Sequence, residues 1–130
     1  MIVLDASAAV EWLLQTPAGR QIEKRIFSRK ESLHAPHLLD LELGQVLRRL
    51  VREAAISAPR ADDAIEDLLD LRVARYPHFV LLPRIWQLRH NLSAYDAAYV
   101  ALAEELGATF ITRDVRLAAA SGHRARVELF

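Results

Sequence analysis

The sequence predicts one α/β domain built around a parallel sheet. Its 130 residues suffice for one hydrophobic core and are too few for two, so residues 1–130 are expected to form a single domain. Hydrophobic residues make up 52% of the chain and charged residues 26%, as in globular proteins. Short β-branched runs alternate with longer helix-forming stretches, which is typical of βαβ units with parallel strands.

Five short runs are candidates for the strands. The run at 2–4 is apolar and β-branched, which indicates a buried strand. Pro36 ends a second run, and Pro77 and Pro83 bound a third. The predicted sheet therefore has four or five strands, at residues 2–4, 32–35, 79–82, 109–112 and 127–129.

Helix-forming stretches fill most of the chain between these runs. A breaker lies at 16–19, Pro59 suits the first turn of a helix, and Gly107 is expected to cap the C-terminus of another. The longest stretch, at 38–54, is amphipathic. The predicted helices span residues 6–14, 20–27, 38–54, 60–71, 84–91, 93–106 and 114–120.

The charges balance overall, with 17 basic and 17 acidic residues, so a strongly basic nucleic-acid binder is not indicated. Their placement is uneven, because residues of one sign gather in blocks. Each block is either a solvated helix face or part of a surface that meets phosphates. The acidic block comprises Asp62, Asp63, Glu66, Asp67 and Asp70, and basic residues gather between 20 and 30, at Arg48, Arg49 and Arg52, and between 113 and 126.

The chain contains no cysteine, which excludes a disulfide scaffold, a thiolate metal site and a cysteine nucleophile. The segment Met1 to Asp5 lacks the basic and apolar regions of a signal peptide. No apolar run approaches the roughly 18 residues of a membrane span. These features are compatible with a protein of the reducing cytoplasm that has no membrane partner, and we expect that location.

Three aspartates follow predicted strands or begin predicted helices. In parallel α/β sheets, chemistry gathers beyond the carboxyl ends of the strands. Asp5 directly follows the first predicted strand, and Asp114 comes two residues after the strand at 109–112. Asp96 stands three residues after Ser93, which is the spacing of a capping box. Helix capping explains each aspartate about as well as a ligand role does.

Glu42 is more informative, because its helix has a clear core face. On a helix that turns about 100° per residue, five apolar side chains fall roughly 40° to 140° from Glu42, namely Leu39, Leu43, Val46, Leu47 and Leu50. The arginines of the same helix fall on the other side. Glu42 thus lies at the border between the core and the basic face, where packing can hold a carboxylate that still reaches a cleft. Asp40 lies on the far margin of the core face and is the weaker candidate.

Converging carboxylates suit a magnesium site. They repel one another unless a cation is bound, and magnesium is a hard cation that takes oxygen ligands. A bound metal can activate water and neutralise charge on a phosphodiester, and two metals about 3.5–4 Å apart could hold both reacting oxygens. The hydroxyls of Ser7 and Thr112 would either orient the neighbouring carboxylates or make ordinary hydrogen bonds at element ends. The candidate acids are Asp5, Glu42, Asp96 and Asp114.

Four segments carry a family resemblance. They are IVLDASA at 2–8, Glu42 in its Leu-rich helix, YDAAYVALA at 95–103 and TRD at 112–114. In this order and at these spacings they resemble the PIN-domain nucleases over the whole chain, with no large insertion. The short single-domain form and the Ala-rich segment around Asp96 resemble the VapC-type toxins of type II toxin–antitoxin modules.

The resemblance implies a three-layer α/β/α sandwich around a parallel sheet, and magnesium or manganese held by the four candidate acids. It implies endonucleolytic cleavage of RNA, of the tRNA or ribosomal RNA class, by metal-activated water. It also implies a homodimer and a cognate antitoxin whose tail enters the active-site groove.

Two features of the long helix bear on this resemblance. We expect its arginines to make salt-sensitive contacts with RNA or antitoxin. Gln45 stands where family members often carry asparagine, three residues after the helix glutamate, and it keeps the amide on a longer side chain. The arginines in question are Arg48, Arg49 and Arg52.

Other classes of α/β protein fit less well. A response-regulator receiver needs an acidic pair after its first strand and a late lysine, whereas Asp5 is single and no lysine follows Lys30. A haloacid dehalogenase-type phosphatase needs a second aspartate two residues after the first, and a P-loop protein needs a glycine-rich motif. His34 and His37 hint at zinc, but Pro36 breaks helical spacing, so we interpret them as surface or core histidines.

The strongest alternative keeps the fold and lacks the activity. A PIN-like domain can serve as a pure RNA- or protein-binding module. Loss of catalysis usually shows as a substituted acid, and here all four acids are present. The sequence therefore favours the nuclease.

Overall fold

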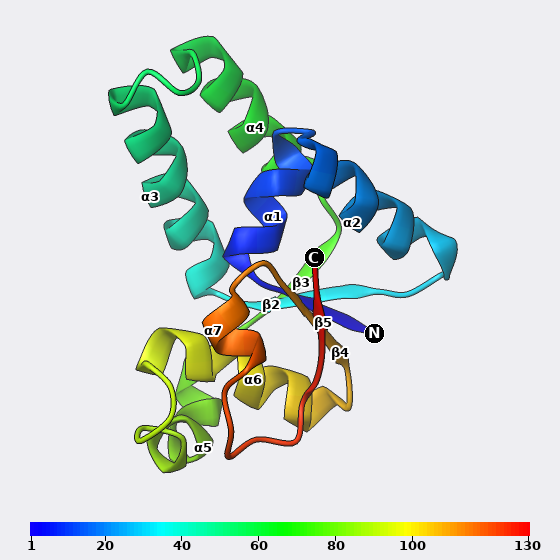
Figure 1. Ribbon diagram of the computed structural model, residues 1–130, viewed down its shortest axis with the longest axis vertical. Helices are drawn as coiled ribbons and strands as arrows, with labels where there is room; N and C mark the ends of the chain where they lie inside the picture. Colours follow the sequence, from blue (N-terminus) through cyan, green and yellow to red (C-terminus); the bar gives the residue numbers. More distant parts are fainter.

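The computed structural model describes residues 1–130 and contains one five-stranded sheet with helices on both faces (Figure 1). The strand order is β3-β2-β1-β4-β5, and every neighbouring pair is parallel. The strands are β1 (Ile2–Leu4), β2 (Leu33–Pro36), β3 (Val73–Tyr76), β4 (Thr109–Thr112) and β5 (Arg126–Leu129). The helices are α1 (Ala6–Leu13), α2 (Pro17–Ser28), α3 (Leu38–Arg52), α4 (Ala58–Asp70), α5 (Leu82–Gln87), α6 (Ala94–Leu106) and α7 (Val115–Ala118), and a 3-10 helix, η1 (His78–Leu81), precedes α5.

The helices form two layers, which confirms the predicted α/β/α fold. On one face of the sheet α1 packs against α2, α3 and α4, and on the other α6 packs against β1, β2 and β4 (Figure 1). Strand β1 lies at the centre of the sheet, and all residues of β1 and β4 are buried. Since β1 and β4 are adjacent and parallel, the residues that follow them lie side by side at one edge.

Helix α6 is buried along most of its length. The seven residues from 97 to 103 are all buried, and four of them are alanines. Short side chains let this helix lie close to the sheet. Tyr99 has the polar side-chain group of this buried stretch, its hydroxyl. The residue is 1% exposed, so the hydroxyl needs a hydrogen-bond partner inside the protein.

The strand predicted at 79–82 is wrong. That segment forms η1 and the start of α5, and Phe79, Val80 and Leu82 are exposed. Pro77 precedes the 3-10 turn, and Pro83 lies in the first turn of α5, where its missing N–H costs nothing. The third strand in the sequence is β3 instead, an edge strand in which one residue of four is buried.

The helix ends follow the expected capping chemistry. Helix α2 starts three residues earlier than predicted, because the Thr16 hydroxyl accepts a hydrogen bond from the Gly19 amide at 3.0 Å. Pro59 lies in the first turn of α4, and Gly107 caps α6 with a φ of 60°, both as predicted. No helix combines the length and apolar character of a membrane span.

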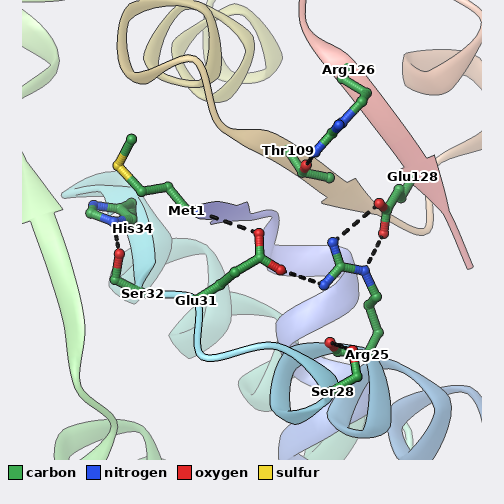
Figure 2. Close-up of polar contacts among 9 residues, drawn as sticks. All are labelled: Met1, Arg25, Ser28, Glu31, Ser32, His34, Thr109, Arg126 and Glu128. Carbon is green, nitrogen blue, oxygen red and sulfur yellow. Dashed lines mark hydrogen bonds and ion pairs between the residues drawn. The ribbon is translucent and has the colours of Figure 1, made fainter.

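An ion-pair network ties β5 to two segments that are distant in the sequence (Figure 2). The Arg25 guanidinium of α2 lies 2.6 Å from a Glu31 carboxylate oxygen and 2.8 Å from a Glu128 oxygen of β5. Glu31 also lies 3.4 Å from the amino group of Met1. The side chains of Arg25 and Glu31 are largely buried, and Arg25 lowers the pKa of Glu31. The network joins α2, the start of β2 and the edge strand β5.

Candidate active site

Three of the four predicted acids gather beyond the carboxyl end of β1. Asp5 follows β1, Glu42 lies in α3, and Asp96 lies in the first turn of α6. The pKa of Glu42 is raised, first by burial and then by repulsion from the other two carboxylates. Repulsion of this kind acts over short distances, so the three carboxylates form one cluster.

Asp5 is the most enclosed member of the cluster. Its residue is 7% exposed, and its Oδ2 accepts hydrogen bonds from the hydroxyls of Ser7 at 2.5 Å and Thr112 at 2.7 Å. Its side chain makes no capping hydrogen bond to α1, so helix capping does not account for it. Burial raises the pKa of Asp5 above its usual range, the two hydroxyls oppose the rise, and Asp96 adds to it.

The hydroxyls on Asp5 are themselves fixed by the backbone. The Ser7 oxygen accepts a hydrogen bond from the Arg113 amide at 2.9 Å, and the Thr112 oxygen accepts one from the Asp114 amide at 3.0 Å. Each hydroxyl has one proton, which it donates to Asp5. The segment after β4 therefore orients one oxygen of Asp5 and leaves its Oδ1 outside this pair of bonds.

Glu42 is oriented by a side chain that the sequence arguments missed. The buried hydroxyl of Tyr99 donates a short hydrogen bond to Glu42 Oε2. Burial and the Glu42 carboxylate both raise the pKa of Tyr99, so the phenol stays protonated and remains a donor. The sequence did contain one signal for this role of Tyr99, its spacing from Asp96. The two residues are three positions apart on α6 and share a helix face.

Asp96 and Asp114 differ in what their carboxylates do. The cap of α6 is Ser93, whose hydroxyl accepts a hydrogen bond from the Asp96 amide at 3.1 Å, and the Asp96 carboxylate makes no side-chain hydrogen bond. Asp114 is the cap of α7, and its Oδ1 accepts hydrogen bonds from the amides of Arg116 and Leu117 at 2.8 and 3.2 Å. Only Asp114 Oδ2 is left for a ligand, so Asp114 is the weaker metal candidate.

The carboxylate oxygens of Asp5, Glu42 and Asp96 are the kind of ligand that a hard cation such as magnesium takes. The chain has no group of three or more His, Asp or Glu side chains placed so that together they could hold a metal ion. Magnesium is commonly held by one or two carboxylates and keeps several waters, so it does not need three protein ligands. The oxygen-only cluster and the raised pKa values of Asp5 and Glu42 fit magnesium or manganese.

The remaining predicted residues lie on or near the cluster's helices. The three arginines of α3 are exposed, and none of them forms an ion pair. Gln45 is exposed, and its side chain makes no hydrogen bond within the chain. His34 is buried, with Nε2 2.7 Å from the Ser32 hydroxyl and Nδ1 2.9 Å from the Tyr76 hydroxyl, so it is a core histidine. The arginines are Arg48, Arg49 and Arg52.

A Tyr99→Phe variant is expected to fold normally and to bind divalent cations about ten-fold more weakly. The ring volume is kept, but Glu42 loses the donor that orients it. Calorimetric titration with Mn²⁺ measures the affinity without reference to activity. Tyr95→Phe is the matched control, because Tyr95 lies on the same helix, is exposed and makes no side-chain hydrogen bond. Equal Mn²⁺ affinity in both variants would contradict the orienting role.

The fold and this site define a class of protein. The chain matches the family model described as the PIN domain over residues 2–122. The protein therefore belongs to the PIN domain family.

Within the family, the sequence is of the VapC type. It is 46% identical over 117 residues to ribonuclease VapC9 of Mycobacterium tuberculosis, which covers 90% of this chain and 88% of that protein. It is 45% identical over 129 residues to ribonuclease VapC12 of the same organism, which covers 99% of this chain and 98% of that protein.

Solved structures share the fold at lower sequence identity. PAE2754 from Pyrobaculum aerophilum superposes with a TM-score of 0.70 at 24% identity, covering 97% of this chain and 81% of that chain. VapBC2 from Rickettsia felis, solved bound to a DNA fragment from its promoter, superposes with a TM-score of 0.68 at 12% identity, covering 99% and 98%.

Proposed function

We propose that this protein is a divalent-metal-dependent endoribonuclease and the toxin of a toxin–antitoxin pair, with a tRNA or ribosomal RNA as its target. The observation that carries the proposal is the cluster of Asp5, Glu42 and Asp96 beyond β1, where burial and mutual repulsion raise the pKa values of the first two. The relatives named VapC ribonucleases support the RNA substrate.

In this proposal Mg²⁺, or Mn²⁺ in its place, supplies Lewis acidity for the attack of water on a phosphodiester. Asp5, Glu42 and Asp96 would hold the ion, and Asp114 would contribute through Oδ2. Thr112 and Ser7 keep Asp5 in one orientation, and Tyr99 does the same for Glu42. Carboxylates held in one orientation need to reorganise less when charge develops during the reaction.

A catalytically inactive binding module of the same fold is the alternative. A domain that only binds RNA has no need of a buried, charged Asp5, because an isolated buried carboxylate costs free energy. The hydroxyl network around Asp5 also fits a functional site better than a simple binding surface. Both features favour the enzyme.

The proposed partners are RNA, a cognate antitoxin and a second copy of the chain, in the cytoplasm where such RNA is found. VapBC2 of Rickettsia felis, which shares the fold, was solved bound to a DNA fragment from its promoter. The exposed arginines of α3, on the same helix as Glu42, would contact RNA or antitoxin. The large apolar side chains exposed on η1 and α5 would be covered in a homodimer. They are Phe79, Val80, Leu82 and Trp86.

Removal of divalent metal is expected to abolish RNA cleavage, with a fall of at least about 100-fold in rate. Purified protein would be incubated with structured RNA in Mg²⁺, in excess chelator, and in chelator followed by Mn²⁺. Cleavage should disappear with the chelator and return with Mn²⁺.

An Asp5→Asn preparation, purified in parallel, identifies contaminating nuclease. The metal mechanism would be contradicted if the unmodified protein still cleaved RNA after exhaustive chelation while the Asp5→Asn preparation did not. RNA binding without cleavage under every condition would favour the inactive module.

A further inference from the structure

We propose that the surface cavity beside Asp96 and Asp114 is a nucleotide subsite, in which Arg116 binds the phosphate next to the scissile one. This proposal rests on the proposed ribonuclease function and adds how the substrate strand is held. The cavity has a volume of about 380 Å³, within the range of about 300–1,000 Å³ typical of small-ligand sites. It is lined by Asn91, Leu92, Ser93, Asp96, Asp114, Arg116 and Leu117.

Arg116 has a fixed backbone and an exposed guanidinium that makes only a long ion pair with Asp114. Its amide donates to Asp114 Oδ1 at 2.8 Å, which fixes the start of its side chain beside the candidate acids. Its side chain is 94% exposed and makes no hydrogen bond, and its nearest acidic atom, Asp114 Oδ2, lies 3.9 Å away. A guanidinium whose N–H groups make no hydrogen bond can bind a phosphate bidentately.

The charged residues of the cavity lining determine where the phosphate next to the scissile one would bind. Asp96 and Asp114 repel an anion that approaches them directly, so a phosphate at the acids needs the metal. Arg116 is the one cation in the lining. A second phosphate of the same strand, one nucleotide along, is therefore drawn to Arg116 while the scissile phosphate lies at the acids.

The uncharged lining suits the rest of a nucleotide. Leu92 and Leu117 are largely buried residues of the lining, and their apolar atoms in the cavity wall would contact a base or sugar. The Ser93 oxygen accepts from the Asp96 amide, which leaves its proton free to be donated. The Asn91 amide nitrogen donates to the Ser121 carbonyl at 2.9 Å, which leaves its oxygen free to accept. Free donors and acceptors of this kind can bind a 2′-hydroxyl.

Cleavage kinetics of Arg116→Ala at several salt concentrations test the subsite. We expect KM to rise about ten-fold, because a charge-assisted phosphate contact is lost. We expect kcat to stay within about two-fold, because the acids are untouched. The slope of log KM against log salt should fall by about 0.7, the contribution of one phosphate contact on a single strand.

Matched variants define what counts against the proposal. Arg116→Lys keeps the charge without the bidentate geometry and should give an intermediate KM. Arg72→Ala removes one exposed arginine outside the cavity and should change neither constant. Unchanged KM and salt slope in Arg116→Ala would overturn the subsite. A fall in kcat at constant KM would also overturn it, since Arg116 would then act in the chemical step.

A binding experiment separates this proposal from the proposed function. Fluorescence anisotropy of a labelled single-stranded RNA would compare Asp5→Asn with Asp5→Asn/Arg116→Ala, neither of which needs to cleave. An affinity loss of about ten-fold supports the subsite even if the wild type shows no nuclease activity. Equal affinities overturn it even if the nuclease activity is confirmed.

The phosphate itself can be changed instead of the arginine. A neutral methylphosphonate beside the mapped cleavage position should raise the KM of the wild type as much as Arg116→Ala does. In Arg116→Ala the same substitution should have no further effect, because the contact is already lost. Additive effects of the two changes, at each position flanking the cleavage site, would place Arg116 elsewhere on the RNA and overturn the assignment.

Discussion

An Asp5→Asn variant is expected to lose RNA cleavage by at least on the order of 10³-fold while keeping its fold. The change removes the charge at the centre of the acid cluster, next to the strand that lies in the middle of the sheet. The asparagine oxygen can still accept the hydroxyl protons of Ser7 and Thr112. Because ionised Asp5 is buried and repelled, the variant should unfold at the same temperature or higher.

Two measurements are needed together, the cleavage rate with Mg²⁺ and the melting temperature. Asp40→Asn is the matched control, since Asp40 lies on α3 two residues before Glu42 but binds Arg75 through both oxygens at 2.8–3.0 Å. That control should cleave RNA at the normal rate. Full activity in Asp5→Asn would mean that the metal ligands are misassigned, and a collapsed fold would mean that Asp5 is structural.

Gly19→Ala is expected to lower the free energy of unfolding by about 3 kcal/mol, the upper end of the usual cost of overpacking. Gly19 lies where α2 crosses α1, and a Cβ there would be 1.9 Å from the Glu11 carbonyl oxygen and 2.9 Å from Trp12 Cα. Both are backbone atoms of α1, so no side-chain rotation relieves the clash. The two helices would have to separate along a buried contact.

Gly44→Ala provides the opposite case in the same protein. A Cβ at Gly44, within α3, meets no atom within 4 Å, so the change should stabilise by about 0.5–1 kcal/mol through helix propensity. Urea titrations of both variants give the two free energies. A Gly19→Ala protein as stable as the wild type would show that α2 can shift away from α1 at little cost.

Most of the fold could be predicted because local signals agreed with the tertiary arrangement. Strands β1 and β4 are buried on both faces and lie in the middle of the sheet, as the apolar run of β1 and the β-branched and aromatic residues of β4 indicate. The run at 79–82 gives a similar signal, but three of its four side chains are exposed, and the prolines beside it favour a helical turn. Strand β3 is an edge strand with a single buried residue, Val73, so it lacks the hydrophobic pattern by which a strand is recognised.

The candidate site was harder to predict than the fold, because capping and ligand roles use the same residue types. Asp5 and Asp114 both precede helices after strands, yet only Asp114 caps its helix through the side chain. That difference depends on rotamers, which the sequence does not specify. Tyr99 resembles a core aromatic in an Ala-rich helix, and its role depends on α3 bringing Glu42 to it from 57 residues away.

The order of the strands has a consequence for synthesis of the protein. Thr112, which fixes the orientation of Asp5, is synthesised 107 residues after it. A nascent chain that ends before β4 lacks this hydroxyl and leaves β1 as an edge. For a nuclease that would be made on a ribosome, which consists largely of RNA, this topology delays assembly of the active site until β4 has been synthesised.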